Sequence, residues 1–253
     1  MAVVAACGLA APDAAVAEDI PCPVPTTETD PIVVRMVPGS LVTGDGAEVV
    51  LAGIARLPAD PDAAEGWGDG TLPPTAEGPL RLLPTAPPDR YGRQPGLLFD
   101  ADGALVQAGL VRDGDALVRP EGIDEACARN LLGIESAARE ARAGLWANAN
   151  NVAKATDKSS LLARNGLYVL VEGRIVSTGY GSRMVFLDFG RSFRTDFTVM
   201  VAESLVSRLR EAGFPVESLE GRKVRVRGII EESGGPAIRL ASPLALELVD
   251  VME

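Results

Sequence analysis

The sequence predicts a mainly β protein of the α+β class, built from two tandem five-stranded β-barrels, the first followed by helices. A length of 253 residues favours about two domains, since a domain usually holds roughly 150 residues. A polar stretch of small residues at 147–164 divides the chain as a linker would. Short apolar runs bounded by Gly, Pro and Asp, typical of strands, lie on both sides of it. We therefore expect domains at residues 32–146 and 165–253.

Composition narrows the functional classes. Hydrophobic residues make up 47% of the chain, enough for sizeable cores, and the net charge is −11. A protein that coats nucleic acid is usually basic, so this charge argues against that class. The lack of histidine removes imidazole bases and histidine-containing zinc sites. The cysteines, at positions 7, 22 and 127, show no CxxC spacing, which excludes a zinc ribbon.

The first residues are typical of an export segment. Residues 1–17 are small and apolar, and Ala15-Val16-Ala17 offers a cleavage site before Glu18. This predicts a periplasmic or secreted protein. Two alternatives stay open: residues 4–7 also match a lipobox, which would make Cys7 a lipid-modified first residue, and the segment could be a plain tail. Residues 18–31, polar and rich in proline, are expected to form an extended lead-in.

Export also bears on the other two cysteines. An oxidising compartment would let Cys22 and Cys127 form a disulfide, and the alternative is two unrelated buried thiols. Beyond the first residues, no stretch of about 20 apolar residues exists, so the sequence predicts no transmembrane helix.

The first domain is expected to begin with a β-hairpin. A strand over 32–37 is broken by Pro38-Gly39 and resumes at 41–42. The chain turns at residues 44–46, which read Gly-Asp-Gly, and continues as a second strand over 48–54. Two apolar runs around an Asp-Gly turn are typical of a hairpin.

The rest of this domain is expected to alternate loop, strand and helix. Residues 58–88 are rich in Pro, Gly and Asp and predict a loop. Arginines 129, 139 and 142 are expected on a solvated helix face, and Trp146 in the core. The other predicted elements are a strand over 96–99, a turn at 100–103, a short helix over 105–110, and a helix over 125–143 that Asp124 caps and Gly133 bends.

One stretch resembles a known family. The run Asp89-Arg-Tyr-Gly-Arg-Gln94 is followed by the strand, the turn and a helix that closes with Gly144-Leu-Trp146. Order and spacing are similar to the C-terminal half of the thermonuclease, or staphylococcal nuclease-like, family. The resemblance implies that the YGR loop presents Arg93 to a phosphate group, and that the helix ending in Gly-Leu-Trp closes the domain.

The same resemblance fails at the other catalytic positions. Family members carry a D-G-D-T turn, a strand arginine and a D-x-P-E run: carboxylates hold calcium, a glutamate assists water, and arginines hold the phosphate, as phosphodiester hydrolysis requires. Here these positions fall on Pro38-Gly39-Ser40-Leu41, on Val50, and on Ala55 and Pro58. Only Arg93 is retained as a catalytic position. The sequence therefore predicts lost activity, no metal site and no cofactor.

Two alternatives to this reading remain. A shifted alignment would bring in Arg56 with the acidic residues Asp60, Asp62 and Glu65, and calcium would then be required by an active nuclease. Conversely, Arg93 could be an ordinary turn residue that pairs with Asp89 or with backbone carbonyls.

The second domain reads as five strands with a helix between the third and the fourth, which is the order of an OB-fold. The runs at 187–190 (LDFG), 194–197 (RTDF) and 221–228 (GRKVRVRG) resemble OB-type domains appended to bacterial nuclease-like proteins. The expected strands lie at 168–177, 183–189, 197–202, 222–231 and 237–240, with a helix over 203–212 and a last segment near 244–251.

Any nucleic-acid surface is expected in this second domain. Residues 1–165 hold 13 basic and 23 acidic side chains, against 11 and 12 in residues 166–253. Lys223, Arg225 and Arg227 alternate with valines and share one strand face, where they could attract phosphates. The alternative is a solvated strand face with aromatic residues in the core. Candidate stacking residues are Phe186 and Phe189, with Tyr180 and Phe193.

Three functional hypotheses follow. The first is an exported, catalytically degenerate thermonuclease-like protein that acts as a binding or assembly module, with single-stranded nucleic acid or another envelope protein as partner. The second is an active metal-dependent nuclease. The third is a structural envelope protein whose two barrels bind protein or glycan. The sequence predicts no oligomeric state.

Overall fold

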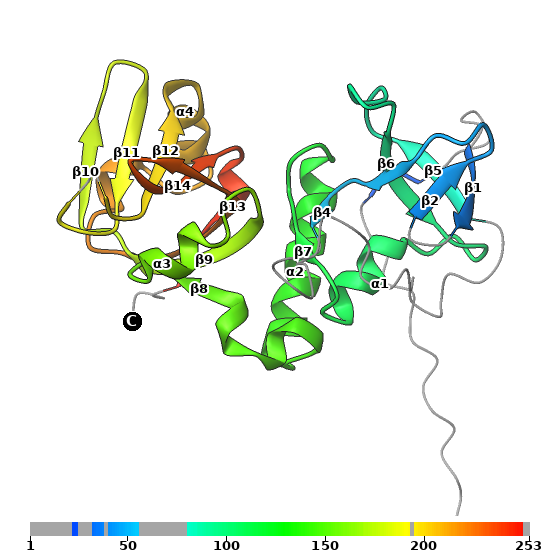
Figure 1. Ribbon diagram of the computed structural model, residues 1–253, viewed down its shortest axis with the longest axis horizontal. Helices are drawn as coiled ribbons and strands as arrows, with labels where there is room; N and C mark the ends of the chain where they lie inside the picture. Colours follow the sequence, from blue (N-terminus) through cyan, green and yellow to red (C-terminus); the bar gives the residue numbers. More distant parts are fainter. Residues whose placement is uncertain (1–21, 25–31, 38–39, 56–79, 193–194, 250–253) are drawn as a thin grey trace, which may run out of the picture.

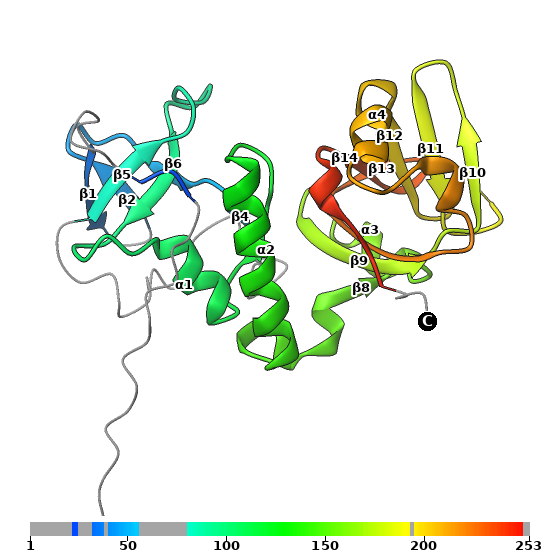
Figure 2. The same cartoon turned by 180° about the vertical axis from the view of Figure 1, so that it is seen from behind.

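The computed structural model describes residues 22–24, 32–37, 40–55, 80–192 and 195–249. Strands outnumber helices in these residues, so the predicted mixed α+β class is correct. Figures 1 and 2, taken from opposite sides, show two β-sheets with helix α2 (Glu125–Glu140) standing between them. We refer to residues up to 151 as the first region and to residues from 152 as the second region.

The first region holds a five-stranded sheet in the order β2-β1-β5-β6-β3. The expected hairpin around residues 44–46 is present but short: Thr43 donates a backbone hydrogen bond to the carbonyl of Ala47, and Val42 forms an antiparallel bridge with Glu48. The longer pairings of these strands were not expected: β2 pairs with β1, and β3 joins β6 in parallel, which buries Val49 and Leu51 in the core. The strands are β1 (Ile32–Val37), β2 (Ser40–Thr43), β3 (Val49–Leu51), β5 (Leu80–Pro84) and β6 (Gln94–Phe99).

The turns and caps of this region follow the sequence signals. Asp100 accepts hydrogen bonds from the backbone N–H groups of Asp102 and Ala104, which builds the expected turn after β6. Asp124 caps α2 by accepting from Ala126 and Cys127. The other elements are α1 (Val106–Arg112), the paired short strands β4 (Ile54–Ala55) and β7 (Leu117–Val118), and α2, which continues through position 133 to Glu140.

The glycine at the start of the Gly-Leu-Trp segment is required for steric reasons. Gly144 has a positive φ of 48°, and a Cβ placed on it would lie 2.5 Å from the carbonyl oxygen of Gly114. Only glycine tolerates that approach, because any side chain would clash with backbone. The contact positions Trp146 in a buried cluster with Ala138 of α2, as predicted.

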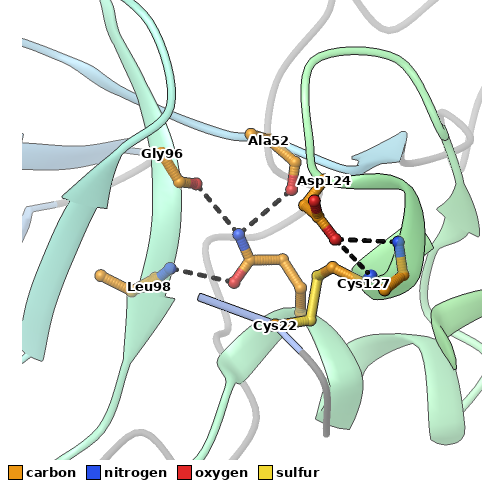
Figure 3. Close-up of a disulfide and its surroundings, with 8 residues drawn as sticks. Cys22, Ala52, Gly96, Leu98, Asp124 and Cys127 are labelled. Carbon is orange, nitrogen blue, oxygen red and sulfur yellow. Dashed lines mark hydrogen bonds between the residues drawn. A yellow bond between two sulfur atoms is a disulfide. The ribbon is translucent and has the colours of Figure 1, made fainter. Parts of the chain in front are cut away.

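A disulfide joins Cys22 to Cys127 in the first turn of α2 (Figure 3). Its sequence separation is 105 residues, so it fastens the start of the described chain to the helical layer. In the same region, the buried Gln107 of α1 accepts from the N–H of Leu98 and donates to the carbonyls of Gly96 and Ala52. The pairing that an oxidising compartment would allow is therefore present.

The predicted linker is ordered in part and contributes to the second sheet. Strand β8 (Val152–Lys154) lies inside residues 147–164 and pairs in parallel with β9 (Tyr168–Arg174). A short helix α3 (Lys158–Leu162) follows β8. Adding β8 covers the outer edge of β9, which is why this stretch is not a free connection.

The second sheet has the order β10-β11-β12-β14-β13-β9-β8, with β15 also paired to β13. β12 and β14 are parallel, and helix α4 (Glu203–Glu211) connects β12 to β13. One core fills its interior, including Phe197, Val199, Leu209 and Val226. The strands are β10 (Ser177–Tyr180), β11 (Met184–Asp188), β12 (Thr198–Ala202), β13 (Lys223–Ser233), β14 (Gly235–Leu240) and β15 (Leu246–Leu248).

Candidate functional site

Arg93, to which the resemblance assigns a phosphate-binding role, belongs to a tight turn before β6. One carboxylate oxygen of Asp89 accepts from the backbone N–H groups of Tyr91 and Arg93, at 2.8 and 3.0 Å. The other oxygen lies 2.8 Å from the Nε of Arg93. The guanidinium groups of Arg90 and Arg93 stand over the exposed Tyr91 ring, 4.7 and 5.3 Å from its centre. The turn is thus braced by its own acidic residue.

The charge of Asp89 is maintained by this arrangement. Burial alone would raise its pKa, but hydrogen bonds from the backbone and side chain of Arg93 hold the pKa below the ordinary value of 3.8. Asp89 therefore stays ionised at neutral pH and opposes the positive charge of Arg93, as the alternative reading of a turn residue expected.

The described residues around this turn do not gather into a metal site. β3 runs beside β6, so Val50 lies opposite Pro95, two residues from Arg93. Ala55 pairs with Leu117 on the short β4–β7 ladder. Within the described ranges, no three acidic or cysteine side chains come close enough to hold a metal ion. Arg56, Pro58, Asp60, Asp62 and Glu65, like Pro38 and Gly39, lie outside the described residues.

The basic ladder of β13 is occupied by carboxylates. Lys223, Arg225 and Arg227 share one strand face, as the alternation predicts, but each forms an ion pair. Glu172 of β9 pairs with Lys223 and with Arg225, and Glu247 of β15 pairs with Arg225 and Arg227. The ladder is therefore a set of interstrand ion pairs. We call these residues, with Glu135 and Arg139 of α2, the β13 ion network.

Arg227 connects the two regions. Its guanidinium is 1% exposed and forms two hydrogen bonds of 2.9 Å to Glu135, whose side chain is also 1% exposed. It donates a third to the carbonyl of Val118, while Glu135 accepts from the N–H of Val118. Tyr168 donates to the same carbonyl at 3.3 Å. An apolar cluster of Leu117, Ala138, Trp146, Tyr168 and Leu170 surrounds these contacts.

Electrostatics keep this network ionised. Burial would lower the pKa of Arg227, but Glu135 and Glu247 raise it above the usual arginine value. Burial would raise the pKa of Glu247, but Arg227, Arg139 and Arg225 hold it below 4.5. Each charge is thus compensated by charges of opposite sign, and Arg227 is closed to a nucleic-acid backbone by the first region.

The predicted stacking residues separate into two groups. Phe189 is buried against Phe197, with ring centres 5.0 Å apart, so it is a core residue. Phe186 is half-buried on the outer face of β11, and Tyr180 is 66% exposed beside it. Phe193 lies outside the described residues.

Phe186 and Tyr180 line an open hollow of about 690 Å³ on the outer face of the second sheet. We call it the β11 hollow. Among the residues that the structure describes, its lining contains one charged group, Asp188, and no lysine or arginine. Asp188 is 7% exposed and accepts a hydrogen bond of 2.9 Å from the hydroxyl of Thr198. The lining residues are Gly179, Tyr180, Phe186, Asp188, Thr198, Met200, Ser233, Gly234 and Ala237.

Sequence reasoning missed four acidic residues: Glu135, Glu172, Glu247 and Asp188. One signal was available for Glu135, because Leu131, Glu135 and Ala138 fall on one helical stripe and all three are buried. A carboxylate on an apolar stripe requires a buried partner. The partner, Arg227, is 92 residues away, and no local pattern points to it.

Comparison of the sequence with protein-family models and with curated proteins finds no match to either. None of the helices in the described ranges is long and apolar enough to cross a membrane.

Proposed function

We propose that this chain is an exported binding protein of thermonuclease-like design that does not hydrolyse phosphodiesters. The carrying observation is the state of Arg93. Its guanidinium is paired with Asp89 inside its own turn, and Val50 occupies the neighbouring strand where the resemblance calls for a second arginine. With Arg93 held by Asp89 and no second arginine at position 50, the charge that develops on a phosphate during attack would have too little stabilisation.

An OB-like architecture for the second region is part of this proposal. β9 and β10 are separated by two residues and pair with β13 and β11, at opposite ends of the strand order. If they are counted as one bent strand, the order becomes 1-2-3-5-4 with a helix between the third and fourth strands, which agrees with an OB-type barrel. The parallel pairing of β12 with β14 fits the same scheme.

Export is supported by the Cys22–Cys127 disulfide, because disulfides persist mainly in oxidising compartments. The export segment itself lies outside the described residues.

The hollow favours a protein partner over nucleic acid. The face that alternation proposed for phosphates is filled by the carboxylates of the β13 ion network. The described lining of the β11 hollow contains the half-buried Phe186 and one acidic residue, and none of its described residues is basic. A polyanion would meet repulsion there, and the whole chain carries −11.

The experiment that tests lost activity is hydrolysis of end-labelled single-stranded DNA by the purified chain, with calcium and with chelator. We expect no cleavage at high protein concentration. The matched control is Arg93→Ala, which separates activity of this protein from a contaminating nuclease. Calcium-dependent cleavage that Arg93→Ala abolishes would overturn the proposal and favour a metal site built from Asp60, Asp62 and Glu65.

A further inference from the structure

We propose that the β11 hollow binds a lysine or arginine side chain presented by a partner protein. This inference deepens the proposed binding function and rests on it. The proposal is based on the positions of Asp188, Phe186 and Gly179 in the hollow.

Asp188 is a buried carboxylate that has no ion pair with a lysine or arginine of the described ranges. It is 7% exposed, and one of its carboxylate oxygens accepts a hydrogen bond from the hydroxyl of Thr198. Among the residues that the structure describes, no lysine or arginine forms an ion pair with Asp188. A buried charge without a partner is costly, and the cost is relieved by a ligand that brings a positively charged donor. The hollow onto which Asp188 opens is where such a donor can arrive.

The walls fit the rest of a basic side chain. Phe186, Met200 and Tyr180 are large and apolar over most of their surface, and they line the same hollow as the carboxylate. Lysine and arginine place an aliphatic stem along apolar surface and a charged head on a polar group. The aromatic faces add cation–π attraction.

Gly179 leaves the necessary room. A Cβ placed on it would lie 3.7 Å from the Cβ of Phe186 and 3.9 Å from the Oδ2 of Asp188. These are ordinary contact distances, so a side chain at 179 would fit without displacing backbone. It would also occupy the space between the ring of Phe186 and the carboxylate of Asp188. A substitution at position 179 can therefore be used to fill the hollow.

Charge complementarity selects a basic partner among proteins. The chain carries −11 and the hollow contributes its own carboxylate. A negative surface attracts a positively charged partner from a distance and repels an acidic one.

The test uses fluorescence anisotropy with the full chain. The probe is a fluorescein-labelled glycine–serine peptide that carries arginines, and its counterpart carries citrulline, which keeps the shape and removes the charge. We expect binding of the arginine peptide, and binding weaker by roughly tenfold or more for the citrulline peptide, as for loss of a charge-assisted hydrogen bond.

Asp188→Asn and Gly179→Val should each weaken binding of the arginine peptide by roughly tenfold or more. The matched control is Glu140→Gln, which removes one negative charge from the exposed end of α2 in the first region and should leave the affinity unchanged. Thermal unfolding of each variant checks that it folds. Asp188→Asn keeps the size of the side chain, so it remains informative if Gly179→Val does not fold.

Equal affinity for both peptides, no binding, or equal weakening by Glu140→Gln would overturn the inference. Binding of oligo-dT that Gly179→Val abolishes would assign the hollow to nucleic acid and would also overturn it. The DNA hydrolysis assay is read separately, so a nuclease result removes the proposed lack of activity without deciding what the hollow binds.

Discussion

Two faces of the second region each hold a buried charged side chain, and they differ in whether that side chain is paired with a residue of opposite charge. On β13, Arg227 is covered by the first region and neutralised by Glu135 and Glu247. On β11, Asp188 is almost as deeply buried but faces an open hollow whose described lining holds no lysine or arginine. From the sequence, the first face was predicted as a binding surface, because basic residues alternate with valines along its strand. The comparison teaches that a charged strand face shows its role only through what the fold places over it.

The largest expected effect on stability comes from breaking the buried ion pair between Arg227 and Glu135. Arg227→Met removes the cation between the two regions and leaves Glu135 buried. We expect a loss of about 3 kcal/mol in the free energy of unfolding, at the low end for a broken buried pair, because Arg139 still lies 3.5 Å from Glu135. Urea denaturation followed by circular dichroism measures it.

The control is Arg239→Met, which removes an exposed arginine paired with Glu231 and should cost less than about 1 kcal/mol. The double variant Arg227→Met with Glu135→Leu should recover most of the loss, since apolar residues can replace a buried ion pair. If Arg227→Met is as stable as the unaltered chain, the contrast between the two faces fails.

A second change, removal of the disulfide, tests whether lower stability alone affects peptide binding, because it alters neither face of the second region. Replacing Cys22 and Cys127 by serine opens a cross-link over 105 residues and should lower the free energy of unfolding by about 2–4 kcal/mol. Denaturation with and without reductant measures it. Affinity for the arginine peptide should stay unchanged, because the disulfide lies in the first region. A loss of peptide binding equal to that of Asp188→Asn would show that the hollow depends on global stability.

The smallest effect is expected in acid. The pKa of Glu247 is held below 4.5 in the folded protein, so its ionised form stabilises the fold above that value. This contribution is lost as the pH falls through the lowered pKa. Melting temperature between pH 7 and pH 3 should therefore fall less steeply for Glu247→Gln than for the unaltered chain. Parallel curves would indicate that Glu247 contributes nothing to the acid response.

Local signals predicted local structure well. Asp124 was identified as a helix cap, and the turn after β6 was placed at Asp100, because each depends on residues within four positions. The pairing of β3 with β6 escaped prediction, since an Asp-Gly turn favours a hairpin while burial of Val49 favours the parallel partner. Pairing between distant strands is decided by the assembled core.

The candidate site was predictable only in part. Phe186 was named from its aromatic ring, and it does line the hollow. Asp188 stood in a noted motif without being assigned a role, because its isolation from cations is a property of the folded sheet. Gly179 lies between the strands expected at 168–177 and 183–189 and was given no role, and its contribution is the space left beside β11.

The buried Arg227 also limits how this sequence could be recombined. A gene fragment that carried residues 152–249 into another protein would bring Arg227 of β13, with Tyr168 and Leu170 of β9, without the first region that covers these side chains. Such a fragment would need a new host that supplies a carboxylate and an apolar wall at the same place. The two halves are therefore expected to be inherited together, with changes at position 227 matched by changes at position 135.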